Sequence, residues 1–144
     1  YAQWKENWYN AYLKEGGFTT LTGFREEGYY KKNDVINHPA QGSAFHCLLW
    51  SLIQLLKDIR KYKLKSLVAG EIHDSGLSDV PINEVQDYLN LIKEVMVNKL
   101  MKAWKWLIVP LEVEAEVCPE GASWFDKTEW INKEGIWQPK NKVA

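Results

Sequence analysis

The chain has 144 residues, of which 46% are hydrophobic and 26% charged, and its formal net charge is −1. This composition is typical of one globular domain and excludes a disordered chain, while the balanced charge gives no overall basic field of the kind that indicates a nucleic-acid partner. Two cysteines and no signal peptide exclude a disulfide framework and indicate a cytoplasmic protein, and no apolar run reaches the ~20 residues of a membrane span.

The first half of the chain predicts a helix, a hairpin and a second helix. In residues 1–15, Trp4, Trp8 and Tyr12 recur at helical spacing, and the glycines at 16–17 end this helix. Residues 17–32 predict a β-hairpin with one strand at 18–22 and a return strand that begins at 29–30. Pro39 then marks the start of a helix. Its broad apolar stripe predicts a buried central helix and consists of Phe45, Leu48, Leu49, Leu52, Ile53, Leu56 and Ile59.

The second half predicts a hairpin, a helix and a strand. Residues 66–72 and 76–80 read as two short strands around a His73-Asp74 turn. Pro81 suits the first position of a helix, and residues 82–103 have the clearest amphipathic spacing in the chain. Residues 111–117 alternate between apolar and glutamate side chains, as in a half-exposed strand, so these glutamates are a solvated face rather than a metal site. This order predicts an α+β fold with a small antiparallel sheet.

The His73-Asp74 pair is the feature that the predicted fold does not explain. Asp, Ser and Gly all suit turns, which accounts for Asp74 and for Ser75-Gly76 after it. A turn gives no reason for the adjacent imidazole. Two neighbouring ionisable side chains are also a poor contribution to a core, so this stretch is a candidate for chemistry.

Four segments resemble blocks of the family A DNA polymerases, in the family's order. Residues 37–44 (NHPAQGSA) resemble N-x-P-x-Q-G-[TS]-A, and residues 71–74 (EIHD) resemble the third catalytic motif, Q-V-H-D-E. Residues 109–113 (VPLEV), with Gly121 and Trp124 after them, resemble V-P-L-x-V followed by G-x-x-W. Residues 17–25 (GFTTLTGFR) resemble the segment that carries T-L-x-G-R-R. The chain therefore resembles the C-terminal palm segment of a bacterial DNA polymerase I-like enzyme, of the kind also found in phages.

The resemblance implies a role for each of five residues. Asp74 would be one of two aspartates that bind the Mg²⁺ pair, and His73 would lie against the 3′ end of the primer. Asn37 and Gln41 would face the minor groove of the primer–template DNA, whose acceptors are common to all base pairs. Arg25 would be a further DNA-binding residue. Deoxynucleoside triphosphates would be the other substrate, and the β-hairpin would be the catalytic hairpin of a partial palm packed on long helices.

Two departures from the family pattern limit what this chain does alone. Ser75 stands where the family usually has a glutamate. The first catalytic aspartate (motif A) and the finger helix that holds the incoming nucleotide have no counterpart in the sequence. Because the chain begins with Tyr1 rather than Met, we expect a piece or subunit that needs an upstream chain carrying motif A and the fingers. The predicted parts are residues 1–36, leading from the fingers, residues 37–130, the palm segment, and a tail at 131–144.

Other interpretations stay open. The chain is alternatively a palm remnant without activity that binds DNA or a protein, a segment of a related single-subunit RNA polymerase, or an unrelated hydrolase that uses His73 and Asp74 as an acid–base pair. Gln41 is alternatively an ordinary polar residue at the start of a helix, without a role in DNA binding. The cationic residues at 57–65 are either a solvated helix end or a phosphate contact. Trp4, Trp8 and Tyr12 predict an apolar surface that an upstream fragment covers.

Overall fold

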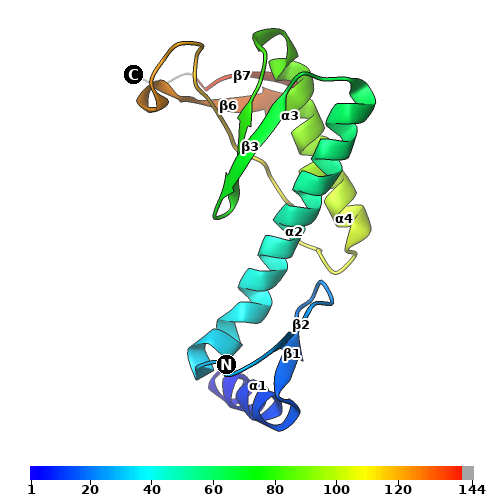
Figure 1. The fold of residues 1–144 in the computed structure, drawn as a ribbon, viewed down its shortest axis with the longest axis vertical. Helices are drawn as coiled ribbons and strands as arrows, with labels where there is room; N and C mark the ends of the chain where they lie inside the picture. The colour runs from blue at the N-terminus through cyan, green and yellow to red at the C-terminus, as the bar shows by residue number, and fades with distance from the viewer. Residues whose placement is uncertain (141–144) are drawn as a thin grey trace. The chain divides into compact units, whose positions relative to one another are not determined.

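A computed structural model describes residues 1–140 and divides the chain into two compact units, Tyr1–Trp50 and Ser51–Ala144. Helices are combined with small antiparallel sheets in both units, which confirms the predicted α+β class (Figure 1). Within the described residues, no helix is long and apolar enough to cross a membrane.

The first unit begins with helix α1 (Ala2–Glu15), which ends as predicted. Gly16 adopts a left-handed conformation, with φ 69°, and its amide donates to the Tyr12 carbonyl at 2.8 Å. Strand β1 (Gly17–Thr19) then pairs with β2 (Arg25–Glu27). The return strand therefore lies earlier than the predicted 29–30, because the turn of residues 20–24 is tight and closes on itself. The core of this unit consists of Tyr12, Phe18 and Val35, with Trp8, Tyr9 and Tyr30 packed against it.

Helix α2 (Lys32–Tyr62) begins seven residues before Pro39, the predicted start, and contains this proline in its interior. The prediction that Pro39 marks the helix start is therefore wrong. The prediction of a buried central helix is wrong for much of the apolar stripe as well. Cys47, Leu55 and Ile59 are buried, but four stripe residues are at least 40% exposed: Phe45, Leu49, Ile53 and Leu56.

The second unit holds the predicted β3–β4 hairpin, with β3 at Leu67–Ile72 and β4 at Ser75–Asp79. Pro81 precedes a nearly continuous helical segment, as predicted. The segment starts as the 3-10 turn η1 (Ile82–Glu84), runs through α3 (Val85–Lys93) and the π-helical η2 (Glu94–Lys99), and ends with α4 (Leu100–Ala103). Its buried side chains join those of α2 in one core cluster of Leu55, Ile59, Tyr88 and Val95.

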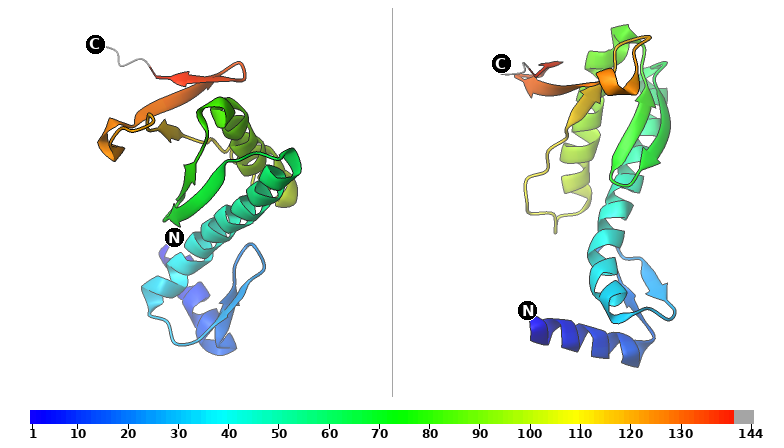
Figure 2. Two further views of the ribbon diagram at one scale, coloured as in Figure 1. Left: turned by 45° about the horizontal axis from the view of Figure 1, so that its top comes forward. Right: turned by 90° about the vertical axis from the view of Figure 1, so that its left-hand side faces the viewer.

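The chain closes with a three-stranded sheet in the order β5-β6-β7, whose strands are Ala115–Val117, Thr128–Lys133 and Ile136–Pro139 (Figure 2). The 3-10 turn η3 (Trp124–Asp126) connects β5 to β6. The strand is shorter than the alternating residues 111–117 predicted, because only Ala115–Val117 pair with a neighbouring strand. Of the predicted tail, residues 131–133 belong to β6 and residues 136–139 to β7, whereas residues 141–144 lie outside the described residues. The glutamates predicted to be solvated are exposed, and Glu116 pairs with Lys127 at 2.6 Å.

Side-chain amides attach this sheet to α3. The Gln86 amide donates to the carbonyl of Trp137 at 2.7 Å and accepts from its backbone N–H at 2.9 Å, as a neighbouring strand would. The Trp137 indole N–H donates to Asn90 at 3.0 Å. Trp137 is buried with Leu89 and Ala115. These contacts cover the free edge of β7 at its centre, where an unpaired edge otherwise invites pairing with another chain.

Candidate functional site

The tip of the β3–β4 hairpin presents His73 and Asp74. Ile72 pairs with Ser75, so His73 and Asp74 are the two central residues of the turn. His73 has a positive φ of 57°. A positive φ at the first central residue is a feature of the primed hairpin turns, whose twist matches that of the strands. Because His73 carries a Cβ, this conformation costs roughly 1–2 kcal/mol relative to an ordinary backbone. Both side chains are exposed.

Ser75 has a structural role in the same turn. Its hydroxyl donates to the carbonyl of Ile72 at 2.9 Å, across the base of the tip. Local bonds of this kind by a serine stabilise turns. The position at which the family usually carries a glutamate is here occupied by a side chain that closes the turn and holds His73 and Asp74 between its two ends.

The hairpin stands on a packed support. Val68 of β3 and Val80 after β4 pack on the cluster of Leu55, Ile59, Tyr88 and Val95 from α2 and the helical segment after the hairpin. The Tyr88 hydroxyl lies 2.5 Å from Ser78 Oγ, and burial raises the pKa of Tyr88 above its ordinary value. A carboxylate at the tip of a two-stranded hairpin is held in place only if the hairpin itself is anchored, and this contact supplies the anchor.

Asp74 offers one carboxylate to a metal ion. Among the described residues, no three or more His, Cys, Asp or Glu side chains are grouped in a way that would hold a metal. Mg²⁺ at phosphate-transfer sites is bound by one or two protein carboxylates and completes its shell with water and phosphate oxygens. An exposed carboxylate on an anchored tip fits one such ligand.

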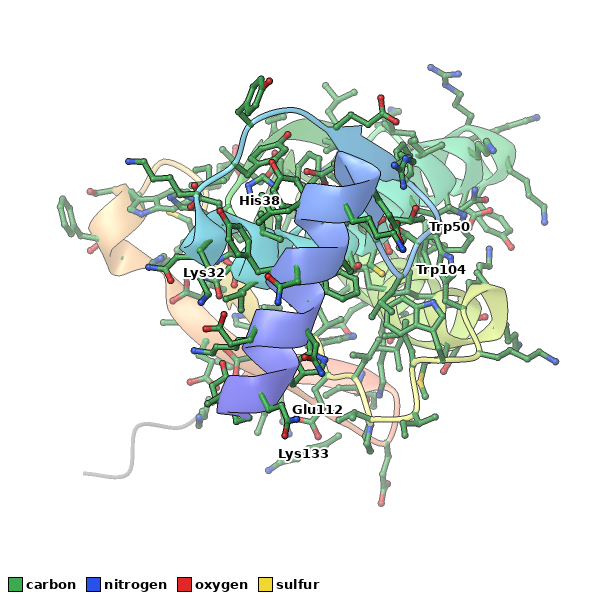
Figure 3. All side chains as sticks on the ribbon, turned by 90° about the horizontal axis from the view of Figure 1, so that it is seen from below. Lys32, His38, Trp50, Trp104, Glu112 and Lys133 are labelled. Carbon is green, nitrogen blue, oxygen red and sulfur yellow. The ribbon has the colours of Figure 1, made fainter. Side chains whose placement is uncertain are left out.

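Asn37 and Gln41 lie in the first unit, near the start of α2. Both are exposed, and their spacing of four residues places them on one face of the helix. Between them, the His38 ring lies 2.8 Å from Glu26 of β2 through Nδ1. Lys32, which forms an ion pair with Glu6 of α1, and His38 are labelled at this end of α2 in Figure 3.

The turn of residues 20–24 supports the same stretch of α2. The amide of Leu21 donates to Ser43 Oγ at 3.0 Å, and Thr22 Oγ1 lies 2.7 Å from Nδ1 of His46. Phe24 stacks on the His46 ring with centroids 3.9 Å apart. The segment that resembles T-L-x-G-R-R therefore touches the segment that resembles N-x-P-x-Q-G, although 12 residues or more separate them.

Arg25 is held by its own unit. Its Nε donates to Glu27 at 3.0 Å, and an Nη donates to the carbonyl of Glu15, at the end of α1, at 3.2 Å. The Arg25 side chain is 43% exposed. Two of its five donors are thus committed within the chain, and no local sequence pattern indicated these contacts. His73 and Asp74 lie together at the tip in the second unit, and Arg25, Asn37 and Gln41 lie in the first.

Comparison with known proteins gives one family. The model of "DNA polymerase family A" matches residues 21–126. DNA polymerase I of Lactococcus lactis subsp. cremoris is 31% identical over 103 residues, which are 72% of this chain and 11% of that protein. The DNA polymerase of Bacillus phage SP01 is 30% identical over 109 residues, 73% of this chain and 12% of that protein. The chain thus spans about a tenth of the length of these relatives.

A solved structure has a similar fold. The POL domain of Pol1 from M. smegmatis, in a complex with DNA primer-template and dNTP, superimposes with a TM-score of 0.60 at 22% sequence identity. The match covers 67% of this chain and 19% of that one. At this identity the likeness supports the fold alone.

Proposed function

Because the chain belongs to DNA polymerase family A, we propose that it is the C-terminal part of a template-dependent DNA polymerase. The observation that carries the proposal is the anchored hairpin tip, which presents an exposed carboxylate next to an exposed imidazole inside the family-matched region 21–126. The relatives that match are named DNA polymerases, and the chain covers only a small share of each.

In this proposal Asp74 is one protein ligand of the Mg²⁺ pair. Two such ions, when bound, stabilise the charge that develops on the attacking and leaving oxygens of nucleotidyl transfer. Asp74 contributes its charge from a fixed position, because Ser75 closes the turn and the core below holds the strands. His73 contributes an exposed ring, carried by a strained backbone, beside Asp74 and at a position suited to contact the 3′ end of the primer. Backbone strain of this kind concentrates at functional sites.

Asn37, Gln41 and Arg25 are proposed as primer–template contacts. An amide side chain donates to the minor-groove acceptors that every correct base pair presents, which senses pairing without reading sequence. The exposed face of α2 that carries Asn37 and Gln41 suits this role. Arg25 reaches DNA with the donors that Glu15 and Glu27 leave available. Deoxynucleoside triphosphates and primer–template DNA are the proposed substrates, in the cytoplasm of a bacterial or phage-infected cell.

The proposed enzyme needs a second part that carries the first catalytic aspartate and the finger helix. One carboxylate does not hold two Mg²⁺ ions, so this polypeptide by itself is expected to extend no primer. Trp4, 50% exposed on α1, belongs to the surface expected to meet that part, whereas Tyr12 of the same stripe is buried in the chain's own core. Trp8 is half-buried.

A reconstitution experiment tests the proposal. The purified chain is mixed with an upstream fragment of a family A polymerase that ends before the segment resembling residues 17–25, and primer extension is followed with Mg²⁺ and all four nucleotides. We expect extension from the mixture and none from either part, together with a higher melting temperature for this chain, because a partner that binds only the folded state stabilises it. Extension by this chain alone would show that the metal-site assignment is wrong.

A further inference from the structure

A cluster of cationic side chains lies where α2 ends and the chain leads into β3, and the proposed polymerase role does not use it. Lys57, Arg60, Lys61, Lys63 and Lys65 are all exposed. We call these five residues, together with Tyr62, the α2–β3 basic surface. Among the residues that the structure describes, none of the five cations takes part in an ion pair.

Two of the nearby carboxylates accept hydrogen bonds from other groups, although Glu84 also interacts electrostatically with Lys65. Asp58 is buried and binds Lys99 Nζ at 2.5 Å. Glu84 accepts from the backbone N–H groups of Lys65 and Ser66 at 2.9 Å and 3.0 Å, and from Ser66 Oγ at 2.7 Å. Asp87 and Asp79 are further exposed carboxylates near this surface: Asp87 lines an open cavity beside Tyr62, and Asp79 pairs with Leu67 at the start of β3. A locally positive surface results, although the whole chain is nearly neutral.

The backbone that carries this surface is rigid. The N–H of Leu64 donates to the carbonyl of Ile59 at 3.0 Å, and that of Lys63 donates to Arg60 at 3.2 Å. This pair of bonds is the Schellman pattern of a helix C-terminus, in which Leu64 also packs on the core that contains Ile59. The backbone N–H groups of the next two residues, Lys65 and Ser66, are held by the hydrogen bonds that they donate to Glu84. Cations on an ordered loop lose less freedom on binding than cations on a mobile one.

Lys63 occupies the position of this pattern that glycine normally takes. Its φ is 57°, in the left-handed region that disfavours a residue with a Cβ. A lysine here gives up stability that a glycine would provide, and what it adds is a positive charge at the centre of the basic surface. Backbone strain of this kind concentrates at functional sites.

An aromatic ring stands among the cations. Tyr62 is 55% exposed, and Lys61 Nζ lies 5.1 Å from the centre of its ring. Beside it is a cavity of about 370 Å³, lined by Tyr62, Leu64, Asp87, Asn90 and Leu91. Proteins that bind single-stranded nucleic acid without sequence preference combine two features. Cationic side chains lie along the path of the phosphate backbone, and aromatic rings between them stack on the bases. An acidic polypeptide would pair with the cationic side chains, but it has no bases to stack on the Tyr62 ring.

We propose that the α2–β3 basic surface binds the phosphate backbone of single-stranded nucleic acid, with a base stacked on Tyr62. The surface is separate from the hairpin tip, because the six residues of β3 span roughly 20 Å between them at about 3.3 Å per residue. Figure 1 shows the loop after α2 and the β3–β4 turn at opposite ends of the hairpin. The proposal is therefore independent of the polymerase role of Asp74.

The test measures binding of a fluorescein-labelled oligothymidylate to the 144-residue chain by anisotropy, over a series of salt concentrations. In the variant with Lys57→Gln, Lys61→Gln and Lys65→Gln, the slope of log affinity against log salt should fall by about 2, at about 0.7 per lost phosphate contact. The control variant changes three exposed lysines elsewhere in the same unit, Lys102, Lys105 and Lys133, to Gln and should keep the full slope. Tyr62→Leu should weaken binding by about tenfold with the slope unchanged, since stacking is not ionic.

A single substitution separates binding from folding. Lys63→Gly should raise the melting temperature and yet weaken oligothymidylate binding, a combination that damage to the fold does not produce. Equal losses in the basic-surface and control variants would overturn the proposal. So would competition by polyglutamate as strong as that by unlabelled oligothymidylate, which would assign the surface to an acidic polypeptide. The binding assay uses neither the upstream part nor primer extension, so failure here is distinguishable from failure of the polymerase proposal.

Discussion

The indole N–H of Trp8 donates to the carbonyl of Val35 at 2.9 Å, across 27 positions of sequence. Val35 is the residue four positions before Pro39, which has no N–H to give the usual helical bond. The acceptor that Pro39 leaves without its helical partner is thus filled by a side chain of α1. This bond explains how α2 continues through a proline, and it joins α1 to the stretch that carries Asn37 and Gln41.

The Trp8–Val35 bond is tested by a double-mutant cycle. Trp8→Phe should lower the free energy of unfolding by roughly 1–3 kcal/mol, because it leaves a buried carbonyl without a donor. In a Pro39→Ala background the helix supplies its own N–H to Val35, so the same change should cost less. The measurement is urea denaturation of the four proteins, and strictly additive effects would show that the two residues are not coupled.

Strain at the hairpin tip predicts that stability and function change in opposite directions. His73→Gly should raise the free energy of unfolding by about 1 kcal/mol, because glycine accepts a positive φ without penalty. The same change should reduce primer extension by the reconstituted enzyme. Thermal unfolding gives the first quantity, and Gly70→Ala, at a position with open space around it and an ordinary φ, serves as a glycine control in the same hairpin. A less stable His73→Gly protein would contradict the strain.

Acid should weaken the link between Glu84 and the start of β3. Hydrogen bonds from the Lys65 backbone and the Ser66 side chain hold the pKa of Glu84 below its ordinary value of 4.5. A carboxylate with a depressed folded-state pKa contributes stability above its unfolded pKa, and that stability is lost as the pH falls through the folded pKa. The melting temperature of the wild-type protein should therefore fall more steeply below pH 4.5 than that of Glu84→Gln.

The control for this experiment is Glu120→Gln, which changes an exposed glutamate elsewhere in the same unit. Its melting temperature should follow that of the wild-type protein at every pH. If Glu84→Gln also followed the wild type into acid, the hydrogen bonds to Lys65 and Ser66 would not be stabilising the charged form.

The sequence was sufficient where local signals agreed with one another. Turn-forming residues between two short apolar runs predicted the β3–β4 hairpin with its tip at His73-Asp74, and regular apolar spacing predicted the helical segment after Pro81. The four blocks that resemble family A polymerases predicted the family that the comparisons show. Each of these features depends on residues that are close together in the sequence.

Contacts between distant residues account for most of what sequence reasoning missed. A proline usually marks a helix start, and nothing near Pro39 shows that Trp8 compensates for its missing N–H. Alternation showed which face of residues 111–117 is exposed, but strand length depends on where a partner strand ends. The bonds from Glu84 to Lys65 and Ser66 join segments 18 positions apart or more.

One miss did have a local signal. Glu134-Gly135 lies between two short runs that contain β-forming residues, Trp130-Ile131 and Ile136-Trp137, and glycine is the usual second residue of a two-residue hairpin turn. The structure shows positive φ at both residues, 53° and 90°, as the I′ turn requires. The β6–β7 hairpin could therefore have been predicted in place of a tail.

The most direct measurement of the central claim is single-turnover nucleotide incorporation by the reconstituted enzyme with Asp74→Asn, compared with Asp79→Asn. Both aspartates are exposed on the same hairpin, one at the tip and one at the far end of β4, so both changes should leave the fold and its melting temperature nearly unaltered. We expect Asp74→Asn to lower the rate by roughly a thousandfold or more, as for loss of a group that stabilises transition-state charge, and Asp79→Asn to leave it close to normal. Near-normal incorporation by the Asp74→Asn enzyme would contradict the assignment of Asp74 as a ligand of the catalytic metal ions.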